Sequence, residues 1–106
     1  WTDWEAALDD GYVAHAPVGS FAANPFGLHD MHGNVWEWCL DGYDENAYPP
    51  AARVDPLIAP EGRLSRVYRG GSFMSAALLA RSAFRSFNTP DKYNQTLGLR
   101  AARALP

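Results

Sequence analysis

The chain has 106 residues, of which 47% are apolar and 13% aromatic, and its formal net charge is −3. This length allows one small domain, which would bury only about 60–65% of its unfolded surface and be modestly stable alone. The charged fraction of 20% is too low for a disordered tail, and an acidic chain with scattered arginines is not expected to bind nucleic acid. No apolar run approaches the ~20 residues of a membrane span, so no membrane partner is expected.

The first part of the sequence predicts short elements separated by loops. Residues 4–8 are expected to form about one helical turn that ends before Gly11. Prolines and glycines over residues 17–33 predict compact loops. Residues 35–40 alternate loosely and are rich in β-forming side chains, which predicts a strand whose Trp36 and Trp38 face opposite sides or bracket a bend.

The second part predicts a long surface loop and two further strands. Residues 41–63 carry several prolines and acidic side chains, which is typical of a surface excursion. A strand is expected over 66–73, ending at a double-glycine bend, and another over 98–103. Between these strands, residues 76–84 are expected to hold one or two helical turns and residues 88–91 a turn.

The run over residues 24–38 is the most informative part of the chain. It places two carboxylates, Asp30 and Glu37, seven positions apart around a glycine turn. Calcium takes about six to eight oxygen ligands and combines carboxylates with backbone carbonyls, which such a turn can supply. In the alternative interpretation, Asp30 caps a turn and Glu37 pairs with an arginine. The arginines expected to pair with Asp30, Glu37 or Asp41 inside the fold, rather than with a ligand, are Arg69, Arg81, Arg85 and Arg100.

Two histidines in the same run, His29 and His32, have a spacing that a helix could use to bind a transition metal. The flanking Gly27 and Gly33 make a helix there unfavourable, and the sequence offers no obvious third ligand. Both histidines are therefore expected to be ordinary surface or turn residues.

Four ordered segments resemble the C-terminal motifs of the formylglycine-generating-enzyme family, also called sulfatase-modifying factor. They are FGLHDMHGNVWEW (26–38), RVYRGGSF (66–73), RSAFR (81–85) and LGLR (97–100). The resemblance implies an α+β, C-type-lectin-like fold that is loop-rich, with a small antiparallel sheet and little helix. Because domains of that family are typically more than twice this length, residues 1–106 are expected to be the C-terminal part of such a domain, incomplete at the N-terminus.

The resemblance also implies metal sites. Members of the family bind calcium through the side chains at the positions of Asp30 and Glu37 and the carbonyls at Gly33 and Val35, so calcium is the expected cofactor. A possible second calcium site is implied at Asp10 and Tyr12. Its remaining ligands come from an upstream segment that this sequence does not contain, and Asp10 with the following glycine is also simply a good turn.

The chemistry of the family is expected to be absent from this chain. Formylglycine generation depends on a pair of cysteines shortly after the Gly-Gly-Ser motif, and their thiolates bind copper. Residues 72–81 read SFMSAALLAR, and the single cysteine of the chain, Cys39, lies elsewhere. One cysteine also excludes an internal disulfide and leaves a reducing cytoplasm as the default compartment. Copper and catalytic residues are therefore not expected.

A ligand surface is expected where the catalytic segment of the family would lie. Trp36 and Ser72 match positions that line the substrate groove of the family, and Met74 and Ser75 follow in the cysteine-free segment. Aromatic and apolar side chains at such a rim can supply binding energy. The alternative is that the tryptophan belongs to the core.

Three functions remain compatible with the sequence. The preferred one is a noncatalytic, calcium-stabilised module for a peptide, protein or small-molecule ligand, in the manner of the variable proteins of diversity-generating retroelements. The alternative is part of a sulfatase-modifying or ergothioneine-synthase-like oxidoreductase whose catalytic groups lie outside this chain. The third is an interaction fragment that an upstream segment or a second chain completes.

Overall fold

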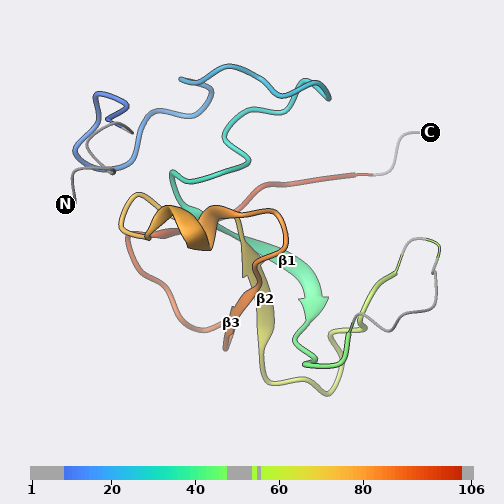
Figure 1. The fold of residues 1–106 in the computed structure, drawn as a ribbon. Coiled ribbons are helices and arrows are strands. Elements are labelled where there is room, and N and C mark those ends of the chain that lie inside the picture. Colours follow the sequence, from blue (N-terminus) through green and yellow to red (C-terminus); the bar gives the residue numbers. More distant parts are fainter. Residues whose placement is uncertain (1–8, 48–53, 55, 104–106) are drawn as a thin grey trace.

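The computed structural model describes residues 9–47, 54 and 56–103, and these form a loop-rich fold around a small sheet (Figure 1). The elements are β1 (Trp36–Gly42), β2 (Arg66–Arg69), the 3-10 turn η1 (Ala77–Ala80), β3 (Ser86–Asn88) and β4 (Leu97–Gly98). These elements confirm the expected fold, which has a small sheet and little helix. The helical turn predicted over 4–8 lies outside the described residues. No helix within the described ranges is long and apolar enough to cross a membrane.

The four strands form one mixed sheet in the order β3-β2-β1-β4. β2 is antiparallel to both β1 and β3, but β4 runs parallel to β1, with Glu37 opposite Gly98. The prediction of an antiparallel sheet is therefore wrong at this edge. The reason is the connection from β3 to β4, which crosses the sheet and enters its far edge in the direction of β1.

All four strands differ from those predicted, and β1 runs over Trp36–Gly42 rather than 35–40. β2 ends at Arg69 rather than at residue 73, because Gly70 and Gly71 adopt left-handed φ values of 96° and 78° that a strand does not use. β3 was not predicted, and the strand expected over 98–103 shares only Gly98 with β4. Segments of two or three residues carry too little periodicity to be recognised, and their pairing partners determine them.

The aromatic cluster lies on one face of the sheet. The rings of Trp36 and Trp38 lie 5.2 and 5.4 Å from the ring of Tyr68, both edge-on. The expectation that the two tryptophans face opposite sides or bracket a bend is therefore wrong, because residues i and i+2 of a strand share a face. Trp36 also lies 5.9 Å from the ring of Phe84, and only 8% of its surface is exposed. This cluster ties β1, β2 and the segment before β3 together.

Asn34 connects the loop before β1 to two distant segments. Its φ is 62°, and its side chain accepts a hydrogen bond from the Ala16 N–H (2.9 Å) and donates one to the Ala16 carbonyl (3.2 Å). Its own carbonyl accepts a hydrogen bond from the N–H of Phe73, 2.8 Å away. Asparagine tolerates the left-handed conformation better than most residues, which is the signal for this role in the sequence.

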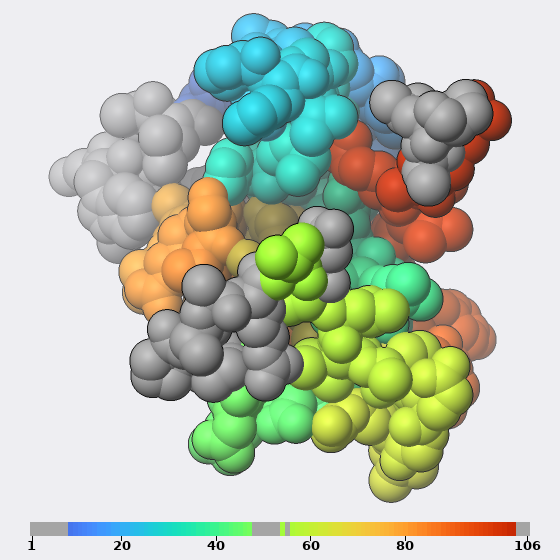
Figure 2. Space-filling view, turned by 90° about the vertical axis from the view of Figure 1, so that its right-hand side faces the viewer, coloured from blue at the N-terminus to red at the C-terminus, as the bar shows by residue number. Residues whose placement is uncertain are grey.

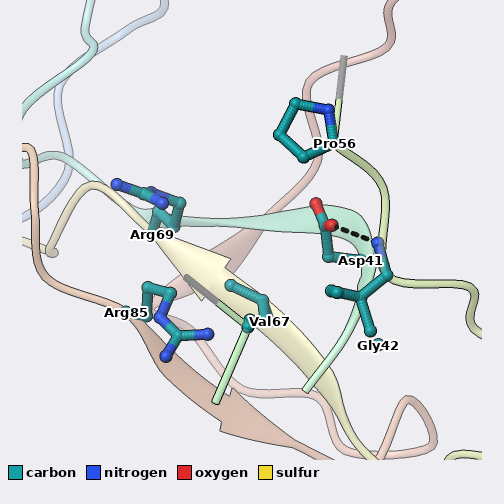
Figure 3. Close-up of a pocket in the computed structure, with 8 residues that line it drawn as sticks. Asp41, Gly42, Pro56, Val67, Arg69 and Arg85 are labelled. Carbon is teal, nitrogen blue, oxygen red and sulfur yellow. Dashed lines mark hydrogen bonds between the residues drawn. The ribbon is translucent and has the colours of Figure 1, made fainter. Parts of the chain in front are cut away.

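The described part of the excursion between β1 and β2 folds back against β1. The Asp41 carboxylate accepts a hydrogen bond from the Ile58 N–H at 3.0 Å, and the Ile58 carbonyl accepts one from the Gly42 N–H at 2.9 Å. A cavity of about 30 Å³ lies beside this contact, with Val67 and Arg85 on its wall (Figure 3). That volume suits about one water molecule, so the cavity is a packing feature rather than a ligand site.

Candidate cation and ligand site

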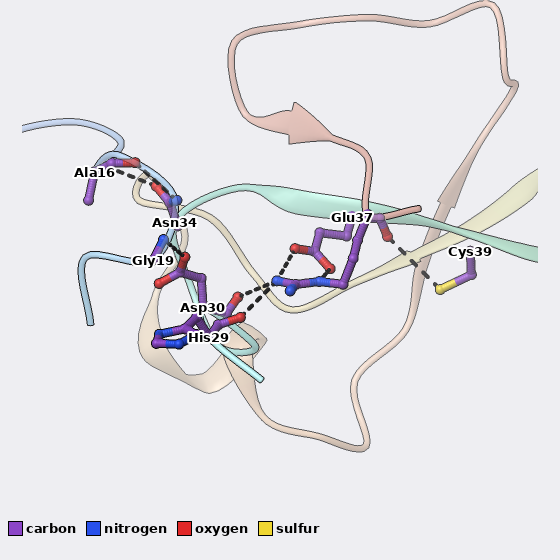
Figure 4. A network of polar contacts seen from close by, with 8 residues as sticks. Ala16, Gly19, His29, Asp30, Asn34, Glu37 and Cys39 are labelled. Atoms are coloured by element: carbon purple, nitrogen blue, oxygen red, sulfur yellow. Dashed lines mark hydrogen bonds and ion pairs between the residues drawn. The ribbon is translucent and has the colours of Figure 1, made fainter. Parts of the chain in front are cut away.

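The candidate site lies where β1 and β4 meet the loop over residues 28–35 (Figure 4). Because Glu37 stands opposite Gly98, Arg100 is brought beside Glu37 although 63 residues separate them in the sequence. The guanidinium contacts both carboxylate oxygens of Glu37: Nε is 2.8 Å from Oε2, and Nη2 is 2.6 Å from Oε1. The predicted pairing of an arginine with Glu37 is confirmed, and Arg100 is the arginine that makes it.

Arg100 also binds the loop that precedes β1. Its Nη2 donates to the carbonyl of His29 at 2.9 Å and approaches the carbonyl of Asp30 at 3.4 Å. The hydrogen bond with Glu37 raises the pKa of Arg100 above its ordinary value, so the guanidinium remains charged. One cation therefore gathers a carboxylate and two backbone carbonyls, which is the kind of ligand set that calcium prefers.

Asp30 directs its carboxylate away from Glu37. Its φ is 56°, and Oδ2 accepts a hydrogen bond from the Gly19 N–H at 2.7 Å. Its other oxygen, Oδ1, is buried and has no hydrogen-bond partner among the described residues. A buried carboxylate oxygen without a partner is costly. The structure thus contains the ion pair of the alternative interpretation, in which Glu37 pairs with an arginine. Asp30, which that interpretation expected to cap a turn, instead accepts its hydrogen bond from Gly19, eleven residues earlier in the chain. One oxygen of Asp30, Oδ1, is left that a cation could satisfy.

The four residues expected to bind calcium therefore differ in how well they fit that ion. Asp30 fits, because Oδ1 is buried and lacks a donor. Glu37 is engaged by Arg100, so it could bind calcium only after that ion pair opens. Within the described ranges no three His, Cys, Asp or Glu side chains come together. Calcium here would consequently depend on carbonyls such as those of Gly33 and Val35.

The residues of the possible second calcium site form a turn. The Asp10 carboxylate accepts a hydrogen bond from the Tyr12 N–H at 3.0 Å, and Gly11 between them has a φ of 83°. Each of the two histidines contacts a backbone carbonyl: Nδ1 of His29 lies 2.7 Å from the Phe21 carbonyl, and Nδ1 of His32 lies 2.6 Å from the Ala80 carbonyl. The two imidazoles are thus held by different segments.

The expected ligand-surface residues divide into two layers. Trp36 and Ser72 are buried, at 8% and 5% exposure, whereas Met74 is 65% exposed. The hydroxyls of Ser72 and Ser75 are 2.8 Å apart, and the Ser75 N–H donates to the Ser72 carbonyl at 2.8 Å. The hydrogen bonds between Ser72 and Ser75 therefore hold a bend from which Met74 projects.

The thiol of Cys39 lies on β1 and is about half buried. Burial raises its pKa above the ordinary value of 9.0, with smaller contributions from nearby charges. A thiol in this environment stays protonated, whereas a soft metal requires a thiolate.

The loop-rich fold, with its small mixed sheet and little helix, places this domain in the C-type-lectin-like class. Residues 1–105 match the family described as "Sulfatase-modifying factor enzyme 1-like domain". The chain belongs to this family, as its four motifs indicate.

The relatives agree on family and fold. The formylglycine-generating enzyme of Thermomonospora curvata is 43% identical over 100 residues, which cover 89% of this chain and 33% of the enzyme. PvdO from Pseudomonas aeruginosa superposes with a TM-score of 0.73 at 32% identity, covering 87% of this chain and 35% of PvdO. Treponema denticola variable protein 1 superposes with a TM-score of 0.74 at 25% identity, covering 92% of this chain and 37% of that protein. The chain thus spans about a third of the length of each of these relatives.

Proposed function

We propose that this chain is a noncatalytic ligand-binding module on a formylglycine-generating-enzyme-like scaffold. The observation that supports the proposal is the bend after β2. It contains no cysteine, its two serines hydrogen-bond to each other, and it presents Met74 at 65% exposure. An apolar side chain on a rigid bend can bind a peptide, protein or small molecule at low entropic cost.

The likeness to a variable protein is compatible with this proposal. Treponema denticola variable protein 1 shares the fold over 92% of this chain. We propose that residues 72–81 correspond to a surface segment that such scaffolds vary, because Met74 and Leu78 are each 65% exposed there. Their substitution would change the surface without disturbing the sheet.

The binding surface can be tested by substitution on an immobilised peptide library. Binders selected by the wild-type chain should be lost in Met74→Glu, because this change places a charge at the centre of the exposed bend. Leu64→Glu is the matched control, since Leu64 is 85% exposed and precedes β2, whereas the bend follows the other end of that strand. Equal loss of binding in both variants, or the absence of selective binders, would refute the proposed surface.

We also propose that calcium stabilises the module at Asp30, Gly33, Val35 and Glu37. The buried, unpartnered Oδ1 of Asp30 supports this, and the gathering of a carboxylate and carbonyls around Arg100 supports it as well. Bound calcium would supply positive charge that joins the loop to β1. Asp30 would hold the loop end of that connection, and Glu37 would hold the strand end.

Thermal unfolding in excess calcium and in chelator tests the metal proposal, because a ligand that binds only the folded state raises its melting temperature. The wild-type chain should gain several degrees with calcium, and Asp30→Asn should gain none. Arg100→Met should show a larger calcium response than the wild type, since it frees both oxygens of Glu37. If neither the wild type nor Arg100→Met responds to calcium, the metal proposal is wrong.

A second candidate is a part of an oxidoreductase whose catalytic groups lie in other residues. It is favoured by the fact that the chain covers only 33% of the Thermomonospora curvata enzyme. Oxygen-dependent conversion of a cysteine-containing peptide, with copper added, distinguishes the two candidates when it is measured on a chimera in which this chain replaces the matching segment of the Thermomonospora curvata enzyme. The second candidate predicts turnover by the chimera, whereas we expect none, because the one cysteine of this chain cannot supply a thiolate pair.

A further inference from the structure

A groove of about 500 Å³ opens where the loop before β1, the end of β2 and the segment after η1 meet. Trp38 and Cys39 of β1 line it as well, together with Arg100 from the segment after β4. In Figure 2 the cyan loop lies above, the orange segment around η1 on the left and the red C-terminal segment on the right. This volume falls within the range of about 300–1,000 Å³ that is typical of sites for small organic molecules.

The segments that form the groove are joined to one another by hydrogen bonds. The Gly33 N–H donates to the Gly70 carbonyl at 2.6 Å, and Nδ1 of His32 lies 2.6 Å from the Ala80 carbonyl. Arg100 binds a further carbonyl of the same loop at 2.9 Å. The groove is therefore formed before any ligand enters, and a ligand loses little free energy to ordering the protein.

The loop before β1 contributes large apolar side chains to the groove. Phe26 is 87% exposed, Leu28 is 44% exposed and Met31 is 36% exposed, and all three line it. Their positions are fixed in part by Asn24, whose side chain accepts hydrogen bonds from the N–H groups of Phe26 (2.9 Å) and Leu28 (3.1 Å). Aromatic and apolar side chains in a concave surface favour a ligand with an aromatic or branched apolar body.

The charged part of the lining is cationic. The groove is lined by three arginines: Arg69, Arg81 and Arg100. Glu37 supplies the only carboxylate among the described residues that line it, and this carboxylate is paired with Arg100. The lining thus has a surplus of positive charge, although the chain has a net charge of −3. Arg81 lies 5.8 Å from the centre of the Phe84 ring and makes no ion pair with the described residues. A guanidinium held in this way can donate two hydrogen bonds to one carboxylate.

We propose that the groove binds a small carboxylic acid with an aromatic or branched apolar body. The body lies against Phe26, Leu28 and Met31, and the carboxylate accepts hydrogen bonds from Arg81. A cationic ligand would be repelled by the surplus of positive charge, and an uncharged ligand would leave that charge without a partner. Met74 is not among the residues that line the groove, so the inference goes beyond the binding surface proposed above.

Calorimetric titration of the 106-residue chain with 2-naphthylacetate tests the proposal. The titration is made in chelator, so that Glu37 stays paired with Arg100. 2-Naphthylacetate should bind at least about tenfold more tightly than 2-naphthylethanol, which has the same body without the charge. Acetate, which has the charge without the body, should not bind measurably. Cys39 lines the groove, so saturating 2-naphthylacetate should also slow the alkylation of its thiol by iodoacetamide severalfold, which locates the bound ligand.

Two pairs of variants assign the contacts. Arg81→Gln should weaken the binding of 2-naphthylacetate by about tenfold and leave that of 2-naphthylethanol unchanged. Arg103→Gln is the matched control, because it removes the same charge at an exposed residue outside the groove, and it should affect neither ligand. Phe26→Ser should weaken both ligands, whereas Leu64→Ser, at a residue that is 85% exposed and outside the groove, should weaken neither. Arg81 and Phe26 are exposed, so both groove variants should keep the melting temperature of the wild type.

Four results would overturn the proposal. The first is equal affinity for 2-naphthylacetate and 2-naphthylethanol, and the second is an equal loss of binding in Arg81→Gln and Arg103→Gln. The third is the absence of binding at millimolar 2-naphthylacetate, or binding that leaves Cys39 unprotected. The fourth is tighter binding of 2-naphthyl phosphate than of 2-naphthylacetate, which would assign the groove to phosphate esters instead.

Discussion

The ion pair between Glu37 and Arg100 should couple the two ends of the candidate site energetically. Exposed ion pairs contribute about 0.2–1 kcal/mol, and breaking a buried pair costs about 3–5 kcal/mol. The side chains of Arg100 and Glu37 are 33% and 23% exposed, and the contact is bidentate. A coupling free energy of about 1.5 kcal/mol is therefore expected for this pair, between those two ranges.

Urea denaturation in the presence of chelator measures this coupling through a double-mutant cycle. The cycle uses Arg100→Met, which keeps the aliphatic stem, and Glu37→Gln, which keeps the shape of the carboxylate. Arg100→Met alone should lower the free energy of unfolding by about 2 kcal/mol, because it also removes the hydrogen bond to the His29 carbonyl, worth about 0.5–1.5 kcal/mol.

A matched control pair is present elsewhere in the chain. Arg63 and Asp44 make a single contact of 3.0 Å, and their side chains are 39% and 30% exposed. Their coupling should stay below about 1 kcal/mol, as is usual for exposed pairs. A coupling of less than about 0.5 kcal/mol between Glu37 and Arg100, or one no larger than that of the control pair, would show that the bidentate geometry does not hold β1 to the loop.

Three further outcomes are expected. Gly71→Ala should lower the free energy of unfolding by about 2–4 kcal/mol in urea denaturation, because its Cβ would lie 2.9 Å from Ala80 at a φ of 78°. Burial raises the pKa of Cys39, so its contribution to stability should be complete below pH 9.0 and be lost as the pH rises through the higher pKa of the folded state, which denaturation at a series of alkaline pH values would detect. In calcium, Glu37→Ala should lower the melting temperature much more than Glu61→Ala, because Glu61 is exposed; equal effects would contradict the role given to Glu37.

The local motifs were sufficient to predict much of this protein. Four ordered motifs indicated the family. The alternation over residues 35–40 predicted β1, although the strand ends two residues later, at Gly42. The density of glycine and proline predicted a loop-rich fold, because these residues interrupt regular elements wherever they occur. Lack of a cysteine pair is a property of composition and needs no structure to recognise.

The contacts between segments that are distant in the sequence are determined by the tertiary structure alone. The sequence offered several arginines as partners of Glu37, and the parallel pairing of β4 with β1 selected Arg100. The same pairing made the sheet mixed, and β3 formed although its three residues carry no readable pattern. Short strands acquire their hydrogen bonds from neighbours far along the chain, so local preference cannot specify them. The choice of cation at Glu37, arginine or calcium, likewise depends on which groups the fold brings within reach of its carboxylate.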